Sequence, residues 1–210
     1  MRTDSRHDPV CIKFHALSRW TARQLGDIAH ERRVAAIASS LFDLTSSLHG
    51  LSGADRRLLR MAAIVHDVGR SIDEETHPQH GARMVREQRD LPLSGGERRW
   101  LAYLTRYHRG RVPAVRSDSI LRGRDDHGRL RTLLALLRAA DGLDSRAAET
   151  PRLRFSLEGR RLRIDCQLEQ NTPKARRVYT RRKKFRLLEQ VLGCRVQVSV
   201  TRARPMRLVA

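Results

Sequence analysis

The sequence predicts a mainly α-helical protein, with a helical bundle over residues 18–146 and a small β-β-α-β annex over residues 151–201. Up to about residue 150, apolar residues recur at intervals of three and four, the period of a helix buried on one face. Beyond that point apolar and polar residues alternate, the period of a half-buried strand. We expect residues 1–17 to be a flexible N-terminus and residues 202–210 to be a basic tail.

Five helices are expected in the bundle. The first follows the apolar positions between residues 18 and 49 and ends before Gly50, a residue type common just past a helix. Residues that often cap a helix or occupy its first turn mark the other starts: Ser52, Thr76 with Pro78, Ser94, and Asp125 or Asp126. These helices should end near Gly69, Gln88, His108 and Leu143.

The annex shows two alternating runs joined by the turn Glu158-Gly159, which predicts a hairpin. A helix is expected from about residue 173 to residue 192, where Gly193 follows. Val196, Val198 and Val200 then alternate as a third strand. On the helix, basic residues at steps of three and four predict one continuous stripe that could bind phosphates: Lys174, Arg177, Arg181 and Lys184.

The chain is strongly basic, with 43 lysines and arginines against 23 acidic residues and a formal net charge of +20. Residues 151–210 alone hold 17 basic and four acidic residues, so the annex with its tail should be the main anion-attracting surface. Such a field favours polyphosphate, nucleotides or nucleic acid as partners. Part of the excess is equally well explained by a general preference for arginine in the composition.

Location and assembly are only loosely indicated. No run of 18 apolar residues exists, and the first residues lack the apolar centre of a signal peptide. The three cysteines, Cys11, Cys166 and Cys194, form no CxxC pair and are typical of free thiols in a reducing compartment. We therefore expect a cytoplasmic protein without a membrane span, and a homodimer is compatible with the sequence.

A candidate metal site begins with His66-Asp67, which ends an apolar helical turn just before Gly69. A buried His-Asp pair costs free energy unless both groups have strong partners. A divalent cation is such a partner, because imidazole nitrogen and carboxylate oxygen are common ligands of iron, manganese and related ions. His66 and Asp67 are therefore the candidate catalytic residues.

Further candidate ligands lie at apolar-to-polar boundaries of four other expected helices: His30, His80, His108 and Asp141. Metal sites in helical bundles are built in this way, from side chains on facing helices. A single histidine on an apolar face is more often an ordinary core residue, but this whole set in this order argues for a site. His7, His15, His77 and His127 are expected at the surface.

The order His30, His66-Asp67, Asp141 resembles that of the HD superfamily of metal-dependent phosphohydrolases, and His80 with His108 resembles its binuclear members. Longer phrases are similar to the C-terminal half of the exopolyphosphatase/guanosine-pentaphosphatase family: "LLRMAAIVHDVGRSI", "HPQHGARMV", "YHRG", "LLRAADGLDSR" and "LLEQVLGCRVQV". The likeness covers about residues 25–200. That family's phosphatase activity is expected from an actin-like ATPase half absent from this sequence, so its chemistry is not carried over.

The resemblance implies an HD-type helical bundle in which His30, His66, Asp67 and Asp141 hold one divalent metal (iron, manganese or magnesium). Asp67 would bridge to a second metal held by His80 and His108. A water activated there would attack phosphorus in a nucleotide or polyphosphate. Arg70 and Arg109 could hold phosphate oxygens, although both could equally be plain surface charges. Arg70-Ser71 stands where alarmone-hydrolysing HD enzymes carry an acidic pair, which argues against that activity.

The main alternative is a non-catalytic module that binds polyphosphate or RNA, with a structural or vestigial metal site. The basic stripe fits either function. Aromatic residues make up only 4% of the chain, so base stacking is poorly supplied. This favours a phosphate-rich ligand over single-stranded nucleic acid, and metal-dependent turnover distinguishes the two functions.

Overall fold

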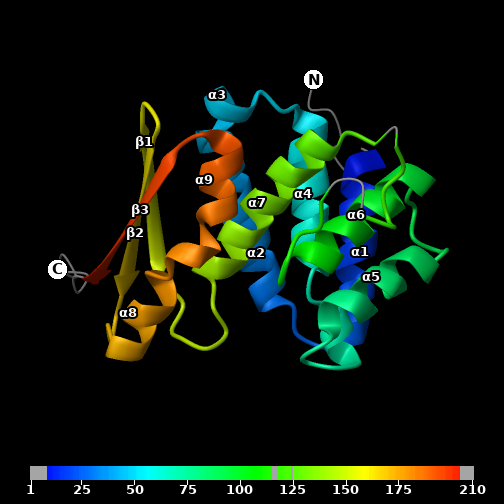
Figure 1. The fold of residues 1–210 in the computed structure, drawn as a ribbon. Helices are drawn as coiled ribbons and strands as arrows, with labels where there is room; N and C mark the ends of the chain where they lie inside the picture. The colour runs from blue at the N-terminus through cyan, green and yellow to red at the C-terminus, as the bar shows by residue number, and fades with distance from the viewer. Residues whose placement is uncertain (1–8, 115–117, 124, 204–210) are drawn as a thin grey trace, which may run out of the picture.

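The computed structural model describes residues 9–114, 118–123 and 125–203. Figure 1 shows a helical bundle with a three-stranded sheet beside it. The helices of the bundle are α1 (Pro9–Leu25), α2 (Ala29–Leu44), α3 (Ser46–His49), α4 (Gly53–Val65), α5 (His77–Glu87), α6 (Gly95–Tyr107) and α7 (His127–Leu143), with a 3-10 turn, η2 (Val68–Ser71). The predicted mainly α-helical fold class is confirmed.

The capping residues start the helices as expected. Ser52 and Ser94 each accept a hydrogen bond from the backbone N–H three residues on, and the acidic residues there, Asp55 and Glu97, accept one in return. These reciprocal bonds satisfy N–H groups that a helix start otherwise leaves without partners. Asp126 caps α7 in a similar way by accepting from the backbone N–H of Arg129.

The N-terminal prediction is wrong for residues 9–17, which belong to α1 rather than to a flexible segment. The helix is held because Leu17 and Trp20 are buried in the bundle core and Lys13 pairs with Glu97 at 2.7 Å. The long helix expected from residue 18 to 49 is divided into α1, α2 and α3. Gly26 has φ +78°, a left-handed conformation that ends α1.

The annex has the predicted β-β-α-β order. Strands β1 (Arg152–Glu158) and β2 (Arg161–Leu168) form an antiparallel hairpin, and β3 (Arg195–Arg202) pairs with β2 in parallel, with Leu162 opposite Val196. The connection between β2 and β3 consists of α8 (Pro173–Tyr179), η4 (Arg182–Lys184) and α9 (Arg186–Leu192). Residues 204–210, most of the expected basic tail, lie outside the described residues.

The single helix predicted from residue 173 to 192 is therefore wrong. Tyr179 and Phe185 are both fully buried, yet in one straight helix they would point about 120° apart. The break between α8 and α9 lets both rings face the same core. Figure 1 shows α9 lying against α7, so this connection also packs the annex onto the bundle. No helix in the described part of the chain is long and apolar enough to cross a membrane.

Candidate metal centre

Four histidine side chains surround the carboxylate of Asp67. The Nε2 atoms of His66, His77 and His108 lie 3.5, 3.2 and 3.3 Å from its Oδ1, and that of His30 lies 3.8 Å from its Oδ2. All five side chains are buried. Two groups of three, His30 with His66 and Asp67, and Asp67 with His77 and His108, each have ligand atoms within 4.8 Å of one another.

Asp141 lies beside the first of these groups. Its Oδ1 is 3.4 Å from Nε2 of His30 and 3.7 Å from Nε2 of His66. The structure thus brings together His30, His66, Asp67, His108 and Asp141 from among the residues predicted from sequence. The chain contributes them from α2, the end of α4, the end of α6 and the end of α7.

The end of α4 explains how neighbours in sequence reach the same point. Side chains of consecutive residues in a regular helix diverge by about 100°. Here α4 ends at Val65, and Asp67 takes φ −100° and ψ 4° before the 3-10 turn η2 begins. This backbone change brings Asp67 to the same cluster as His66, so the two side chains act as one unit.

The other ring nitrogen of each histidine has its own partner. The Nδ1 atoms of His66, His77 and His108 lie 2.7–2.8 Å from the carbonyl oxygens three residues earlier, those of Ala63, Glu74 and Thr105. A carbonyl only accepts, so each Nδ1 must carry the proton. In the neutral ring, Nε2 is then left with its lone pair facing the cluster.

With the rings neutral, these tautomers leave acceptors facing acceptors. Nε2 of His77 and Nε2 of His108 are 3.2 Å apart, and both lie near a carboxylate oxygen. Nε2 of His30 and of His66 are buried without a hydrogen-bond partner among the described residues. Buried polar atoms of this kind are costly. Divalent cations at the two groups would satisfy these atoms, so the residues present fit a metal.

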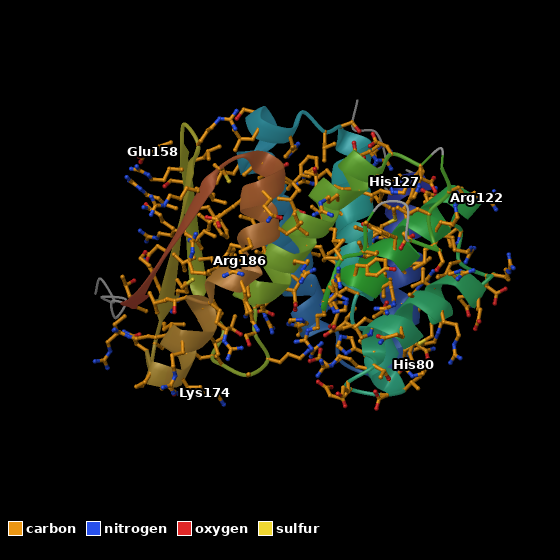
Figure 2. All side chains as sticks on the ribbon, in the orientation of Figure 1. His80, Arg122, His127, Glu158, Lys174 and Arg186 are labelled. Carbon is orange, nitrogen blue, oxygen red and sulfur yellow. The ribbon has the colours of Figure 1, made fainter. Side chains whose placement is uncertain are left out.

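His80, the predicted partner of His108, does not reach this cluster. It lies on the outer side of α5 beside Arg83, where Nδ1 is 3.4 Å from a guanidinium nitrogen, and Figure 2 shows it at the periphery of the helix. His77 takes its place, although a surface position was expected for it. The helix face explains this correction: Gly81 and Val85, at steps of four from His77, are buried, whereas Arg83 and Glu87 accompany His80 on the exposed side.

Electrostatic effects keep the carboxylates ionised. Burial opposes charge on Asp67 and Asp141, but the surrounding imidazoles hold the pKa of both well below the usual range. Burial likewise opposes protonation of His66, yet Asp67 and Asp141 beside it raise its pKa to about 9, so a proton and a cation would compete for its Nε2. Burial lowers the pKa of His108. Two ionised carboxylates at the centre attract a cation to the point where the Nε2 atoms meet.

A second layer of residues, not predicted from the sequence, holds the cluster in position. Asp144 lies 2.8 Å from Nδ1 of His30 and also pairs with Arg33 at 2.9 Å. Arg146 contacts Oδ2 of Asp67 at 3.3 Å and forms an ion pair with the buried carboxylate of Glu31. The available signal was a second carboxylate three residues after Asp141, at the point where α7 ends.

The cluster lies at the floor of a pocket of about 610 Å³ whose wall is cationic. Of the predicted phosphate-binding residues, four line it: Arg70, Arg109, Arg181 and Lys184. Lys174 and Arg177 do not, because the break after α8 leaves them exposed elsewhere on the annex; Figure 2 shows Lys174 at the far end. Arg138, Arg146 and Lys183 add to the wall. The continuous basic stripe is thus wrong, and only its C-terminal half faces the site.

A match to a family model shows to which protein family the chain belongs. The family model described as Ppx/GppA phosphatase, domain III, matches residues 18–187. The chain belongs to this family. The match to this Ppx/GppA domain covers every residue of the metal centre and also Arg181 and Lys184. The annex residues at the pocket therefore lie within the family domain. The resemblance seen in the sequence to the C-terminal part of that family is confirmed.

Proposed function

We propose that this Ppx/GppA domain is a metal-dependent phosphohydrolase of the HD type, acting on a phosphate-rich anion such as a nucleotide or polyphosphate. The observation that carries the proposal is the convergence of four Nε2 atoms and two carboxylates at the floor of a cationic pocket. Ligands of this kind suit divalent metals, and the pocket above them suits phosphate.

The donor set favours iron over magnesium. Nitrogen donors from His30 and His66 with a carboxylate oxygen form one group, and those from His77 and His108 form the other. Imidazole-rich sites suit iron, whereas magnesium prefers oxygen ligands and retains water. Asp67 belongs to both groups and would take part in holding a cation in either, and Asp141 lies beside the first group.

When bound, divalent cations would supply the positive charge that polarises a phosphate and activates water for attack. The residues of the chain do the remaining work. Arg109, Arg181 and Lys184 at the pocket wall would hold non-bridging phosphate oxygens by charge-assisted hydrogen bonds. Arg146 fixes the orientation of the Asp67 carboxylate, and Asp144 fixes that of the His30 ring. Arg70 is already paired with Glu74, so its share in binding is smaller.

The alternative function, a module that binds polyanions around a structural metal, is less well supported by the geometry. The cluster is buried but forms the floor of an open pocket, since His30, Asp67, His108 and Asp141 all line it. A purely structural site has no need of this access. Turnover remains the measurement that separates the two functions.

The test begins with elemental analysis of the purified protein, followed by a phosphate-release screen with Mn²⁺ or Fe²⁺ over nucleotides and linear polyphosphates. We expect about two metal ions per chain and metal-dependent release from at least one phosphate-rich substrate. Asp67→Ala should abolish this release and reduce metal content, whereas His80→Ala, on the same helix as His77 but outside the cluster, should leave both unchanged. Full activity of Asp67→Ala would refute the mechanism.

A further inference from the structure

A second and larger cavity, of about 710 Å³, lies away from the histidine cluster. Its walls come from the outer sides of α5 and α6 and from residues 119–122, and it shares no lining residue with the metal pocket. We call it the arginine groove, because seven of its lining residues are arginines and only one, Glu87, is acidic. In Figure 2, Arg122 of this groove and Lys174 of the annex lie on opposite sides of the molecule.

Two of the arginines are structural. Arg98 donates to the backbone carbonyl oxygens of Gln88 and Leu91 and so ties the end of α5 to α6. Arg99 donates to the carbonyl of Gly95 and approaches Asp125 at 3.4 Å. These guanidinium groups are already occupied, and they hold the shape of the groove.

The other five arginines are not neutralised: Arg83, Arg86, Arg89, Arg106 and Arg122. Within the described part of the chain, none of them has a carboxylate oxygen within 4.0 Å. Arg83 is hydrogen-bonded to the ring of His80, and Arg106 lies over the ring of Tyr107. Like charges gathered around one hollow repel one another, and an anion placed between them would relieve that repulsion.

The size and lining of the groove restrict the ligand. Its volume is in the range of small-molecule sites, and guanidinium groups bind phosphate oxygens in pairs. None of the lining residues is aromatic, so a base would find no aromatic ring on which to stack. Together, these features favour a ligand with several phosphate groups close to one another over a ligand recognised by its nucleobase.

We infer that the arginine groove is a second anion site, which binds a small anion carrying several phosphate groups and is separate from the metal centre. The phosphates could come from an inorganic condensed phosphate or from a phosphate ester, since both present the same oxygens. The site requires no turnover at the metal centre, so it stands whether or not the proposed function holds.

The test compares two variants that lose the same charge. Arg83→Gln/Arg86→Gln/Arg89→Gln removes three exposed groove arginines, and Arg154→Gln/Arg161→Gln/Arg195→Gln removes three exposed arginines of the annex sheet. Binding of inorganic tripolyphosphate and of a nucleoside triphosphate is measured by calorimetry on the full chain at about 0.15 M salt. In the groove variant, the affinity of one of the binding sites should fall at least tenfold, so that this site is no longer detected. The sheet variant should bind both ligands with the stoichiometry and affinity of the unmodified protein.

Equal stoichiometry and affinity in the two variants would overturn the inference. Groove-dependent binding of the nucleoside triphosphate but not of tripolyphosphate would also overturn it, because the groove would then recognise the nucleoside. If the triple variant does not fold, the single Arg86→Glu variant carries the same test. If the unmodified protein binds tripolyphosphate in the groove but releases no phosphate from any substrate, only the proposed function is contradicted.

Discussion

Replacing Gly69 with alanine should weaken both the fold and the metal centre, because this residue lies where two backbones touch. A Cβ atom at Gly69 would lie 2.2 Å from the carbonyl oxygen of His77 and 2.4 Å from the backbone nitrogen of Gly81. Ordinary contacts of a carbon atom lie at about 3.5–4.0 Å. The turn η2 and the first turn of α5 would therefore have to separate by roughly an ångström or more.

Overpacking of this kind costs typically about 1–3 kcal/mol, and the atoms here belong to rigid backbone. We expect Gly69→Ala to lower the free energy of unfolding by about 3 kcal/mol, which in a chain of this length corresponds to a fall in Tm of roughly 6–12 °C. Because the carbonyl that must move belongs to His77, its ring should shift away from Asp67. Metal content should fall toward one ion per chain.

Urea unfolding followed by circular dichroism, together with elemental analysis, measures both effects. Gly53→Ala is the matched control, since the new Cβ would meet only the flexible end of Arg57 at 3.5 Å. That variant should be as stable as the unmodified protein or slightly more so. If Gly69→Ala unfolds at the same urea concentration as the control and keeps its metal, the contact between η2 and α5 does not position the cluster.

Three further predictions concern single side chains. His77→Ala should lose about one metal ion per chain by elemental analysis, while His80→Ala should lose none; the opposite pattern would restore His80 as the ligand. Lys184→Met keeps the aliphatic packing but removes a charge from the pocket, so KM for a phosphate-rich substrate should rise several-fold. The control Arg177→Gln removes the same charge from exposed α8 and should leave KM unchanged. Burial raises the pKa of Glu97, but its ion pair and capping bonds hold it below the usual range, so its contribution should be complete above about pH 5 and fade as the pH falls through the lowered pKa. The stability difference between the unmodified protein and Glu97→Gln in urea unfolding should accordingly shrink in acid, and a constant difference would contradict the assignment.

Much of the bundle could be predicted because local signals and burial agree there. Ser52, Ser94 and Asp126 start helices in the sequence as they do in the structure, since a cap is a local hydrogen bond. The ends of α4, α6 and α7 could be placed to within a few residues. This accuracy was sufficient to select His66, Asp67, His108 and Asp141 as neighbours.

The errors arise where packing between distant segments decides. His77 and His80 both stand in the first turn of α5, and the sequence does not say which of them faces Asp67 until the buried face of the helix is known. The basic stripe failed for a similar reason: Tyr179 and Phe185 both enter the annex core and thereby break the helix that would have carried it. Asp144 and Arg146 act on ligands from other helices, so their roles depend on tertiary structure.

The nitrogen donors of the metal centre lie on four different helices or directly after them. Two helices that follow one another in the sequence therefore do not contain the whole cluster. A cation with high affinity for the folded chain would therefore bind unfolded or partly folded forms weakly. Binding of this type adds to folding stability by mass action, and for a tightly bound ion the addition can be several kcal/mol. Loss of the ion would then precede or accompany opening of the whole bundle. The lifetime of the metal complex and resistance to proteolysis should rise and fall together.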